Sequence, residues 1–502
     1  MNVLFMTPEY YPFAKSGGLA EVAEAITVNL VQKGLNVTVC VPYYKQVSQQ
    51  KFRISGKISK IEIDPPEDCL KFFHNNNIDN LSKKKIANEL RFFDILPYKY
   101  KGVNILFIKN DYLFNRDFLY SDGNIDYEDN LLRFALFNYA SLVYVSDNML
   151  KFDVIHCNDW QTSLVPALAK FKFKLASKIL LTIHNLGYQG LFPSEQFQCT
   201  FLSKYLLNIE GFEYFGKINL LKGGIEFADI ITTVSKKYAL EIQTSEYGFG
   251  LEGVLHVGSQ KLYGILNGVD YDEWNPETDK YIAKNFTSKN YKTGKKSCKK
   301  DLLNNFFGKD SAAGLMDKPV ISIVARLDEQ KGFDILIEAM PEIIKNNTLF
   351  IILGTGSPEI EKELKKIADK YPQNIGLKIE YNNQLAHKIE AGSDFYIMPS
   401  KYEPCGLNQM YSMAYGTVPI VRGTGGLDDT IINYNAETDN IEESNGFKFY
   451  NFSGEDLSKT VNYAISLYYS DKNAMAKLIL NGMQSNFSWE RSINEYIELY
   501  NK

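Results

Sequence analysis

The chain has 502 residues, and because a single hydrophobic core stops growing at about 250–300 residues, we expect two large domains. It is 45% hydrophobic and 23% charged, as ordinary soluble proteins are, and its formal net charge of −5 gives no reason to expect nucleic acid as a partner. The 6 cysteines form no C-x-x-C pair, which argues against a disulfide framework and favours a reducing compartment.

No segment predicts export or membrane insertion. The first apolar run, NVLFMT, begins at residue 2 and is followed directly by proline and glutamate, so we expect no signal peptide. No apolar run approaches the ~20 residues that a membrane helix needs. These features predict a cytoplasmic protein without a membrane partner, and they leave its oligomeric state open.

The first forty residues predict a strand, a helix and a second strand. NVLFMT (2–7) and VTVCVP (37–42) are continuous apolar runs, and the apolar residues between Leu19 and Leu30 recur at helical spacing. Gly34 is a natural helix stop. Continuous apolar strands that alternate with amphipathic helices indicate a parallel sheet covered on both faces.

The same alternation continues through the first half of the chain. We expect strands at 153–159, 178–185, 228–235 and 261–270, and a helix at 163–171. Residues 64–100 are polar and irregular, so we expect loops there. Residues 275–318 are rich in lysine and predict a connector with an entry helix, whose basic run forms a solvated face.

A second cycle of strands and helices begins at VISIVAR (320–326). Strands are expected at 320–326, 348–354, 376–381, 394–400 and 418–422, and helices at 334–345, 359–370, 385–391 and 406–415. The pattern predicts two doubly wound α/β domains of similar size, which we place at residues 1–260 and 261–485. The last helix, within residues 486–502, is expected to pack back on the first domain.

Open α/β sheets bind ligands beyond the carboxyl ends of their strands, so the residues that follow each strand are the candidates. AKSGGLAEV (14–22) follows the first strand. Gly17 and Gly18 allow a ligand to approach the backbone closely, free N–H groups at a helix start favour anions, and Lys15 adds a positive charge. The corner suits a phosphate, although a glycine turn with a surface lysine explains it equally well.

Later strands of the first domain also end in polar residues. Asp159 and Trp160 could supply a carboxylate and a flat apolar platform, both of which sugars use. His184 ends a fully apolar run, where a lone histidine is more often a structural residue with satisfied hydrogen bonds. Asn267 lies in NGVD, which predicts a tight turn.

In the second domain, cations and glycines cluster beside predicted helix starts. Arg326 and Lys331 suit a diphosphate, although a surface ion-pair cluster with the neighbouring acidic residues is a serious alternative. Glu403 precedes a helix, where a carboxylate can be a cap or a ligand. GTGGLDDT (423–430) suits phosphate or ribose oxygens.

The sequence predicts no metal site. Asp270 and Asp272 form a D-x-D, but in a predicted turn without a second acidic cluster. The 5 histidines are scattered, and there is no P-loop, H-E-x-x-H or G-x-S-x-G motif.

Six motifs, taken together and in this order, resemble those of bacterial glycogen synthases and the related starch synthases. They are KSGGLAEV, HCNDW, TIHNLGYQG, ILNGVDYDEWNP, ARLDEQKGFD and EPCGLNQMYSMAYGTVPIVRGTGGLDDT. The resemblance spans nearly the whole chain and implies the GT-B fold, in which two Rossmann-like domains face each other across a deep cleft. It also implies transfer of glucose, with retention of configuration, from ADP-glucose to the non-reducing-end 4-hydroxyl of an α-1,4-glucan such as glycogen, without a cofactor or metal.

The resemblance also assigns roles by position. It implies catalytic roles for His184, Arg326, Lys331, Glu403 and Asp159, and donor-binding roles for Lys15, Gly17, Gly18, Asn267, Tyr381, Cys405, Gly406, Thr424, Gly425 and Gly426. Arg326 and Lys331 would clamp the diphosphate, and His184 would hold the glucose. Tyr381 would stack on the adenine, and Asp159 would lie near the acceptor.

Two positions depart from patterns in related enzymes. Glu21 stands where the family motif usually has aspartate, which leaves its role in the donor pocket open. Tyr411 stands where sucrose- and lipid-glycosylating relatives carry a second glutamate, which favours the glycogen and starch synthase branch. The alternatives are a UDP-glucose-dependent glucosyltransferase of the same fold and a non-catalytic protein that binds glucan or nucleotide sugar. The combined presence of the candidate catalytic residues argues against the second.

Overall fold

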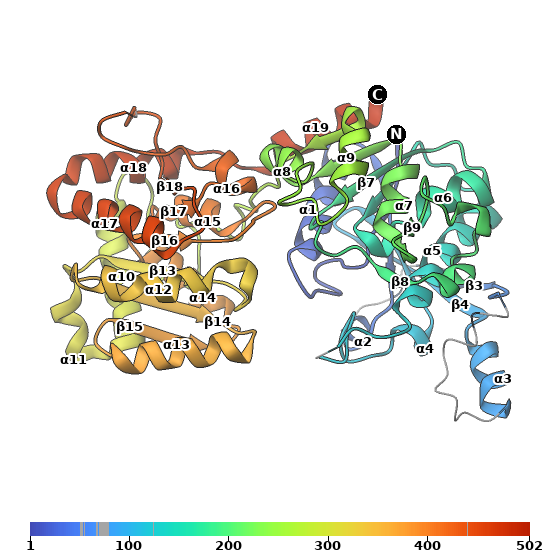
Figure 1. The fold of residues 1–502 in the computed structure, drawn as a ribbon, viewed down its shortest axis with the longest axis horizontal. Coiled ribbons are helices and arrows are strands. Elements are labelled where there is room, and N and C mark those ends of the chain that lie inside the picture. The colour runs from blue at the N-terminus through green and yellow to red at the C-terminus, as the bar shows by residue number, and fades with distance from the viewer. Residues whose placement is uncertain (51–53, 55, 67–68, 70–79, 124, 439) are drawn as a thin grey trace. The chain divides into compact units, whose positions relative to one another are not determined.

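The computed structural model describes residues 1–50, 54, 56–66, 69, 80–123, 125–438 and 440–502. The chain divides into two compact units (Figure 1). The N-terminal unit comprises Met1–Val234, Ala239–Ile265 and Trp489–Lys502, and the C-terminal unit comprises Ser235–Tyr238 and Leu266–Ser488. The last segment of the chain therefore belongs to the same unit as the first.

The N-terminal unit is built on a nine-stranded sheet with the order β12-β11-β7-β6-β1-β2-β5-β4-β3. Its strands are β1 (Asn2–Met6), β2 (Asn36–Pro42), β3 (Ser59–Glu62), β4 (Phe92–Tyr100), β5 (Val103–Lys109), β6 (Val154–Asn158), β7 (Lys178–Ile183), β11 (Ile230–Thr233) and β12 (Leu262–Gly264). β1 pairs in parallel with β2 on one side and with β6 on the other, so the direction of winding reverses between β1 and β6. Ligands of such sheets bind at this reversal.

The expectation of loops over residues 64–100 was wrong for its last part. FFDILPYKY forms β4, which pairs antiparallel with β5 and with the short β3, and α3 (Asn80–Glu89) precedes it. The strand has a buried face on alternate residues near its start, where Phe93 and Ile95 are 1% exposed. Asp94, Pro97 and Lys99 interrupt its apolar residues, so a search for continuous apolar runs missed the strand. Residues 67–68 and 70–79 of that range lie outside the described residues.

The predicted strand 261–270 is also much shorter than expected. Only Leu262–Gly264 is strand, and the chain then continues as a loop through Asn267 into the C-terminal unit. The apolar run that suggested a longer strand has buried side chains at Ile265 and Val269, which pack without entering the ladder.

The C-terminal unit is built on a six-stranded parallel sheet with the order β15-β14-β13-β16-β17-β18. Its strands are β13 (Val320–Val324), β14 (Leu349–Gly354), β15 (Ile375–Ile379), β16 (Phe395–Met398), β17 (Val418–Arg422) and β18 (Phe447–Phe449). Numbered within this sheet, the order is 3-2-1-4-5-6, in which dinucleotide-binding folds hold their ligands beside the first and fourth strands. The first and fourth strands here are β13 and β16.

Both faces of this second sheet are covered, which explains its continuous apolar strands. Phe350 and Ile352 of β14 join one core with α12 (Phe333–Ile344) and α17 (Gly454–Ser470). Leu349 and Ile351, on the opposite face of the same strand, join a second core with α10 (Tyr291–Phe307) and α14 (Asn383–Gly392). Alternate residues of a strand point to opposite faces, so a strand between two helical layers is apolar throughout.

The remaining helices connect these strands. Those of the N-terminal unit include α1 (Leu19–Gln32), α2 (Lys45–Ser48), α4 (Asp111–Phe114), α5 (Asn130–Asp147), α6 (Val165–Ala167), α7 (Leu220–Phe227), α9 (Glu252–Val257) and α19 (Trp489–Asn501). Those of the C-terminal unit include α11 (Lys309–Ala312), α13 (Pro358–Lys370), α15 (Asn408–Ala414), α16 (Gly425–Thr430) and α18 (Lys472–Gln484), while α8 (Lys236–Glu241) spans the division. A small antiparallel sheet of β8 (Leu191–Pro193), β9 (Glu213–Tyr214) and β10 (Lys217–Asn219) completes the N-terminal unit. None of the described helices combines the length and apolar character needed to span a membrane.

The lysine-rich run in 275–318 is only partly the solvated face that its composition predicted. Lys292, Lys296 and Lys300 are exposed on α10. Lys295 and Lys299, which lie one turn apart on the inner face, are anchored. Lys295 donates to Thr417 Oγ1 at 2.7 Å, and Lys299 pairs with Asp394 at 2.7 Å. The helix therefore docks on the sheet partly through buried ammonium groups.

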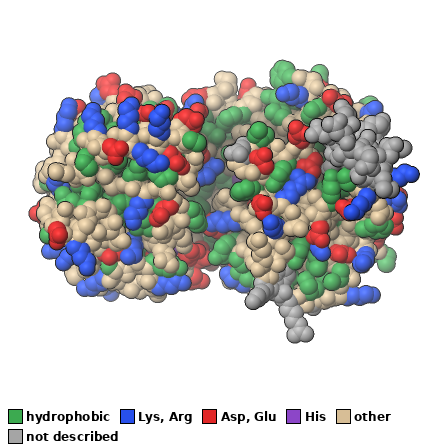
Figure 2. Space-filling model, turned by 90° about the horizontal axis from the view of Figure 1, so that it is seen from below, with side chains coloured by type: hydrophobic (Ala, Val, Ile, Leu, Met, Phe, Trp, Pro, Cys, Tyr) green, Lys and Arg blue, Asp and Glu red, His purple; other side chains and the backbone are tan. Residues whose placement is uncertain are grey.

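Elsewhere, acidic and basic side chains are interspersed on the face shown in Figure 2, with no large field of one sign.

The C-terminal helix α19 is held to the N-terminal sheet by a buried chain of hydrogen bonds. Tyr500 Oη lies 2.7 Å from His156 Nδ1, and His156 Nε2 lies 2.7 Å from Thr182 Oγ1. Thr182 Oγ1 in turn lies 2.6 Å from Thr232 Oγ1. Burial lowers the pKa of His156 well below its usual value, so the imidazole is neutral. The chain links α19 to β6, β7 and β11.

We expect Tyr500→Phe to destabilise the N-terminal unit by about 1–3 kcal/mol, because it leaves Nδ1 of His156 buried without its partner. Urea unfolding followed by tryptophan fluorescence would measure the change. Tyr469→Phe is the matched control, since that tyrosine is 46% exposed and its hydroxyl makes only a long 3.4 Å bond to Asn347. Equal unfolding midpoints for the two variants would contradict the prediction.

Candidate active site

The glycine-rich corner follows β1, at the point where the N-terminal sheet reverses its winding. Lys15 to Gly18 connect β1 to α1, and Gly18 precedes the helix in a right-handed conformation, with φ −71° and ψ −18°. A Cβ atom added at Gly17 or Gly18 would meet no heavy atom within 4 Å. Nothing in the described part of the unit therefore requires glycine at these two positions.

Glu9, which the sequence analysis did not single out, holds this corner in place. Its carboxylate accepts the backbone N–H groups of Ser16 at 2.6 Å and Gly17 at 3.2 Å, and the hydroxyls of Ser16 at 2.6 Å and Tyr120 at 2.7 Å. Glu9 is 3% exposed. The expectation of free N–H groups at this corner was therefore wrong for Ser16 and Gly17, because a protein carboxylate already occupies the place an anion would take. A carboxylate directly after a buried strand was the available signal.

Lys15 and Glu21 form an ion pair across the start of α1. Both side chains are partly exposed, at 33% and 41%. The carboxylate at the position where the family motif usually has aspartate thus orients the ammonium group of the corner. The longer side chain of glutamate bridges from the first turn of the helix back to Lys15.

Asp159 follows β6, the strand next to β1, and its carboxylate supports the loop after β7. Oδ1 accepts the backbone N–H of His184 at 2.7 Å, and Asp159 itself adopts φ 57° and ψ −176°, a conformation that costs a non-glycine residue energy. Burial raises the pKa of this carboxyl to about 7, against the lowering effect of backbone N–H groups from His184 and Asn185. Asp159 therefore retains its proton to near neutral pH.

His184 is a neutral imidazole in one defined tautomer. Its Nε2 lies 2.9 Å from Asn158 Oδ1, and the Asn158 amide is fixed because its Nδ2 donates to the carbonyl of Met6 at 3.0 Å. Nε2 must therefore carry the proton, which leaves Nδ1 as an acceptor. Burial lowers the pKa of His184 to about 3, so the ring stays neutral at physiological pH. Such a ring can accept a hydrogen bond from a hydroxyl group.

Trp160, by contrast, is not the open platform that its sequence position suggested. It is 8% exposed, packs edge-to-face against Phe134 with centroids 5.2 Å apart, and contacts the tilted ring of Phe192 at 5.8 Å. The backbone at Gly190 comes so close that a Cβ atom there would lie 2.6 Å from the indole ring. Trp160 supports the loop after β7 and cannot present its face to a sugar.

In the C-terminal unit, the candidate cations follow β13 and the candidate carboxylate follows β16. Lys331 Nζ lies 2.7 Å from Glu403 Oε2, which also accepts the Ser400 hydroxyl at 3.0 Å. The side chains of Lys331 and Glu403 are 19% and 8% exposed. Arg326 is 61% exposed and contacts Asp328 at 3.3 Å, and Asp328 caps the turn that carries Lys331. The acidic neighbour therefore positions both cations, and the ion-pair cluster and the candidate site are the same group of residues.

The loop after β17 packs backbone to backbone on the Glu403 loop. Gly425 has φ +47°, and a Cβ atom there would lie 1.9 Å from the carbonyl oxygen of Glu403. The Gly426 N–H donates to the carbonyls of Glu403 at 3.1 Å and Pro404 at 3.2 Å. These glycines are thus required by packing within the protein, and in this structure the Gly426 N–H is committed to the neighbouring loop rather than offered to an anion. Thr424, at the same corner, is 1% exposed.

The remaining predicted donor residues lie around these loops. Cys405 is 6% exposed, and its sulfur accepts the backbone N–H of Asn267, whose own Oδ1 is buried without a partner. Burial raises the pKa of the Cys405 thiol to about 12, so the group is unreactive. Gly406 has φ +69° and leads into α15. Tyr381 follows β15 and is 78% exposed.

The structure therefore gathers the predicted residues into two sets. Lys15, Gly17, Gly18, Asp159 and His184 lie at the carboxyl ends of β1, β6 and β7. Asn267, Arg326, Lys331, Glu403, Cys405, Gly406, Thr424, Gly425 and Gly426 lie around the carboxyl ends of β13, β16 and β17, and Tyr381 follows β15.

Two family models match the chain. The one described as starch synthase catalytic domain covers residues 2–257, and the one described as glycosyl transferases group 1 covers residues 309–482. Glycogen synthase from Koribacter versatilis is 41% identical over 100% of this chain and 98% of its own length. Glycogen synthase from Thermotoga maritima is 37% identical over 100% of this chain and 99% of its own length.

This chain belongs to the glycogen synthase and starch synthase family. Among solved structures, the catalytic domain of starch synthase IV from Arabidopsis thaliana, bound to ADP and acarbose, is 29% identical with a TM-score of 0.84, covering 100% of this chain and 98% of that one. Sucrose-phosphate synthase from Thermosynechococcus elongatus is 15% identical with a TM-score of 0.59, and the match covers 100% of this chain and 98% of that one. At this identity the likeness shows the fold alone. The predicted GT-B fold and the assignment as a glycosyltransferase of glycogen synthesis are thereby confirmed.

We expect Gly17→Ala to leave stability within about 0.5 kcal/mol of the wild type, because the new methyl group meets open space. We expect the same variant to raise the KM for the sugar donor by about tenfold or more, because only a ligand close to the backbone would meet that methyl group. Thermal unfolding and steady-state kinetics would measure the two effects.

Gly425→Ala is the contrasting variant, since its Cβ would strike the Glu403 carbonyl. We expect it to lose several kcal/mol of stability, on the order of the cost of the larger core disruptions. If Gly17→Ala keeps both its stability and its donor KM, the glycine at that corner has no role in binding.

The raised pKa of Asp159 predicts a pH-dependent contribution to stability. Since its folded pKa of about 7 lies above the unfolded value of 3.8, the protonated carboxyl favours folding below pH 4, and that contribution is lost as pH rises to 7. We expect Asp159→Asn to gain on the order of 4 kcal/mol relative to the wild type between pH 4 and pH 8. Urea unfolding at several pH values would measure this difference. The substitution can also change stability by an amount that does not depend on pH, but that amount does not affect the slope. If the difference in free energy of unfolding between the variant and the wild type does not change with pH, the raised pKa is refuted.

Proposed function

We propose that the protein elongates α-1,4-glucan by transferring glucose from ADP-glucose to the non-reducing-end 4-hydroxyl, with retention of configuration. The observation that carries this proposal is the Lys331–Glu403 pair beside the reversal point of the C-terminal sheet. The similar starch synthase IV was solved with ADP and acarbose, a nucleoside diphosphate and a sugar analogue. Family membership supports a nucleotide sugar and a glucan as the substrates.

Negative charge develops on the diphosphate as the bond to the anomeric carbon breaks. Lys331 and Arg326 supply the positive charges that would stabilise it, and their positions are fixed before the reaction by Glu403 and Asp328. Preorganised charge of this kind costs no reorganisation when the bond breaks, and loss of one such donor typically slows a reaction by about 10²–10³-fold. Glu403 keeps a second oxygen, Oε1, with which it can accept a glucose hydroxyl.

The sugar itself would be recognised from the N-terminal unit. The neutral His184 ring offers Nδ1 as an acceptor for a glucose hydroxyl, and its backbone is held by Asp159. Lys15, oriented by Glu21, would approach the donor phosphate with its side chain.

The exposed ring of Tyr381 supports adenine as the base, since it offers a free aromatic face for stacking. That the transfer needs no metal or other cofactor, and that it takes place in the cytoplasm, remain predictions from the sequence. The UDP-glucose-dependent enzyme and the non-catalytic binding protein are the alternatives that the following experiment separates.

We expect the protein to release nucleotide rapidly when it is incubated with glycogen and ADP-glucose, and at least about tenfold more slowly with UDP-glucose. Lys331→Ala and Glu403→Ala should each lower kcat by about tenfold or more, because each removes a contact to the developing charge or to the sugar. A coupled assay of nucleotide release would measure all of these rates.

Lys459→Ala is the matched control, because Lys459 forms an exposed ion pair with Glu455 on the surface of the same unit. It should leave the rates unchanged, as expected for a surface pair. Faster release with UDP-glucose would assign the other donor, and glycogen binding without release from either donor would assign a non-catalytic protein. If both Lys331→Ala and Glu403→Ala release nucleotide at the wild-type rate, the proposed site is wrong.

A further inference from the structure

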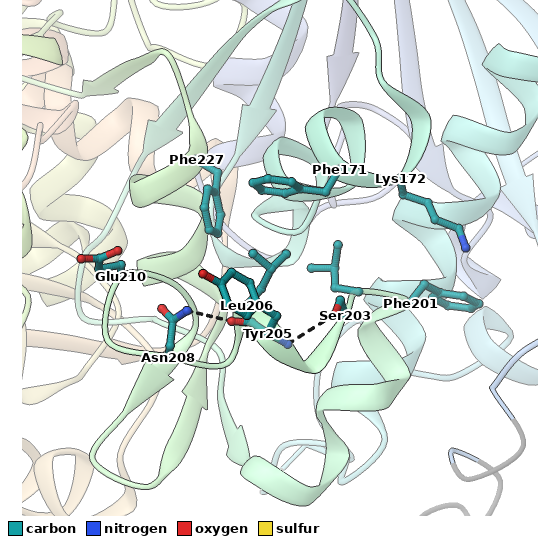
Figure 3. A pocket seen from close by; sticks show the side chains of 10 residues that line it. Phe171, Lys172, Phe201, Ser203, Tyr205, Leu206, Asn208, Glu210 and Phe227 are labelled. Carbon is teal, nitrogen blue, oxygen red and sulfur yellow. Dashed lines mark hydrogen bonds between the residues drawn. The ribbon is translucent and has the colours of Figure 1, made fainter.

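Side chains at the amino ends of the strands lie away from the proposed transfer site. The cavity in Figure 3 is an example: it has a volume of about 740 Å³, and Phe171, Tyr205 and Phe227 are among the residues that line it. Phe171 precedes β7 and Phe227 precedes β11, so this cavity lies towards the amino ends of those strands. A residue that assists the transfer is instead expected at the carboxyl ends, beside the candidate cations. In the C-terminal unit that place is the reversal point between β13 and β16.

β13 and β16 separate at this reversal point before either strand has ended. The last pair of their ladder joins Ser322 to Tyr396, whereas β13 continues to Val324. On its other side β13 is still paired with β14 there, and the N–H of the next residue, Ala325, donates to the Leu353 carbonyl at 3.1 Å. The N–H and carbonyl of Val324 point to the opposite side, towards β16, beyond the last pair of that ladder. Backbone groups in such a place need another partner.

The side-chain hydroxyl of Tyr396 takes the place of the missing strand partner. It accepts the N–H of Val324 at 2.9 Å and donates its proton to the carbonyl of the same residue at 2.9 Å. Asn408, the first residue of α15, donates its Nδ2 to this hydroxyl at 2.6 Å and to the Val324 carbonyl at 3.2 Å. The one proton and both lone pairs of the hydroxyl are therefore used. Burial raises the pKa of Tyr396 well above its usual value, so the group keeps the proton that it donates.

These hydrogen bonds hold the backbone that carries Arg326. Val324 is held by the Tyr396 hydroxyl, and the N–H of Leu327 donates to the Thr355 carbonyl at 3.1 Å. Arg326 lies between these two anchored positions, although its own side chain is 61% exposed. The direction in which the backbone presents the guanidinium group therefore depends on a buried hydroxyl two residues away.

The same hydroxyl also reaches the other half of the candidate site. Asn408 begins α15, the helix that follows Glu403, and Glu403 pairs with Lys331 at 2.7 Å. Through Asn408, the Tyr396 hydroxyl joins the end of β13 to the start of α15. Both segments border the place where the proposed function puts the diphosphate.

We propose that Tyr396 is a positioning residue for glucosyl transfer, whose hydroxyl holds the end of β13 so that Arg326 meets the leaving diphosphate. The proposal rests on the proposed function, which assigns Arg326 to the diphosphate. A guanidinium group that is fixed before the bond breaks stabilises the developing charge without reorganisation. Phenylalanine at position 396 would keep the packing of the ring and would remove only the hydroxyl, which leaves the Val324 N–H without its partner.

The test is a double-mutant cycle of Tyr396→Phe and Arg326→Ala. We expect Tyr396→Phe to lower kcat by about tenfold and to raise the Kd for ADP, measured by calorimetry, about threefold, because the guanidinium group is displaced rather than removed. Arg326→Ala alone should lower kcat by about 10²-fold. Adding Tyr396→Phe to Arg326→Ala should change neither kcat nor Kd by more than about twofold, because the hydroxyl acts through the arginine.

Tyr468→Phe is the matched control, because its hydroxyl lies near the amino ends of the same two strands. That hydroxyl accepts from Lys299 at 3.4 Å, and Lys299 also binds Asp394, which directly precedes β16. The control should keep kcat and the Kd for ADP within about twofold of the wild type. If Tyr396→Phe does not fold, Asn408→Ala tests the same contact, since it removes the second donor to the hydroxyl, and its effect should also depend on Arg326.

Wild-type kcat and Kd in Tyr396→Phe would overturn the proposal. Equal effects of Tyr396→Phe with and without Arg326 would overturn it too, because the hydroxyl would then act independently of the arginine. Binding of ADP needs no turnover. A wild type that binds ADP with the expected coupling but releases no nucleotide would therefore refute the proposed function and not the role of Tyr396.

Discussion

A parallel strand cannot turn back on itself, and this constraint places the functional residues of both units. Each strand must cross over through a helix to reach its neighbour, so all the carboxyl ends of a parallel sheet face the same edge. In the N-terminal unit this edge carries Lys15, Asp159 and His184, although about 170 residues separate the first from the last. In the C-terminal unit it carries Lys331 and Glu403 on either side of the reversal point. Sequence separation therefore matters less than the strand that each residue follows.

The same constraint explains why much of the fold could be predicted. Strands buried on both faces are continuous apolar runs, and β13, β14, β16 and β17 each lie where such a run was found. The antiparallel strand β4 was missed because Asp94, Pro97 and Lys99 interrupt its apolar residues. The strand expected at 261–270 was overextended, because apolar residues can be buried in a loop as well as in a ladder. The pattern of apolar residues predicts which side chains are buried. It identifies a strand reliably only where both faces of the strand are buried.

For the site, the sequence indicated which side chains lie at strand ends but not how their hydrogen bonds are satisfied. Glycine-rich corners suggested open backbone N–H groups, yet Glu9 occupies those of Ser16 and Gly17, and the Glu403 loop occupies that of Gly426. These contacts join residues that are distant in sequence or depend on a backbone turn, so no local pattern encodes them. Their effect is to tie the loops to the rest of each unit through hydrogen bonds within the protein. The predicted site residues remain predictions in their roles, although their positions at the strand ends agree with those roles.

Tyr411, in α15 of the C-terminal unit, has a packing role. The Tyr411 ring stacks on Trp274 with centroids 4.1 Å apart, and Trp274 also stacks on His387 at 3.9 Å. Asp279 holds His387 through a 2.7 Å hydrogen bond and accepts the Tyr415 hydroxyl at 2.5 Å. A glutamate at position 411 would place a carboxylate beside the indole face, whose π electrons repel negative charge, and would remove one ring from the stack. A carboxylate at position 411 is thus incompatible with the aromatic packing of Trp274. Glu403, which precedes α15, is therefore the carboxylate that this part of the chain places beside Lys331.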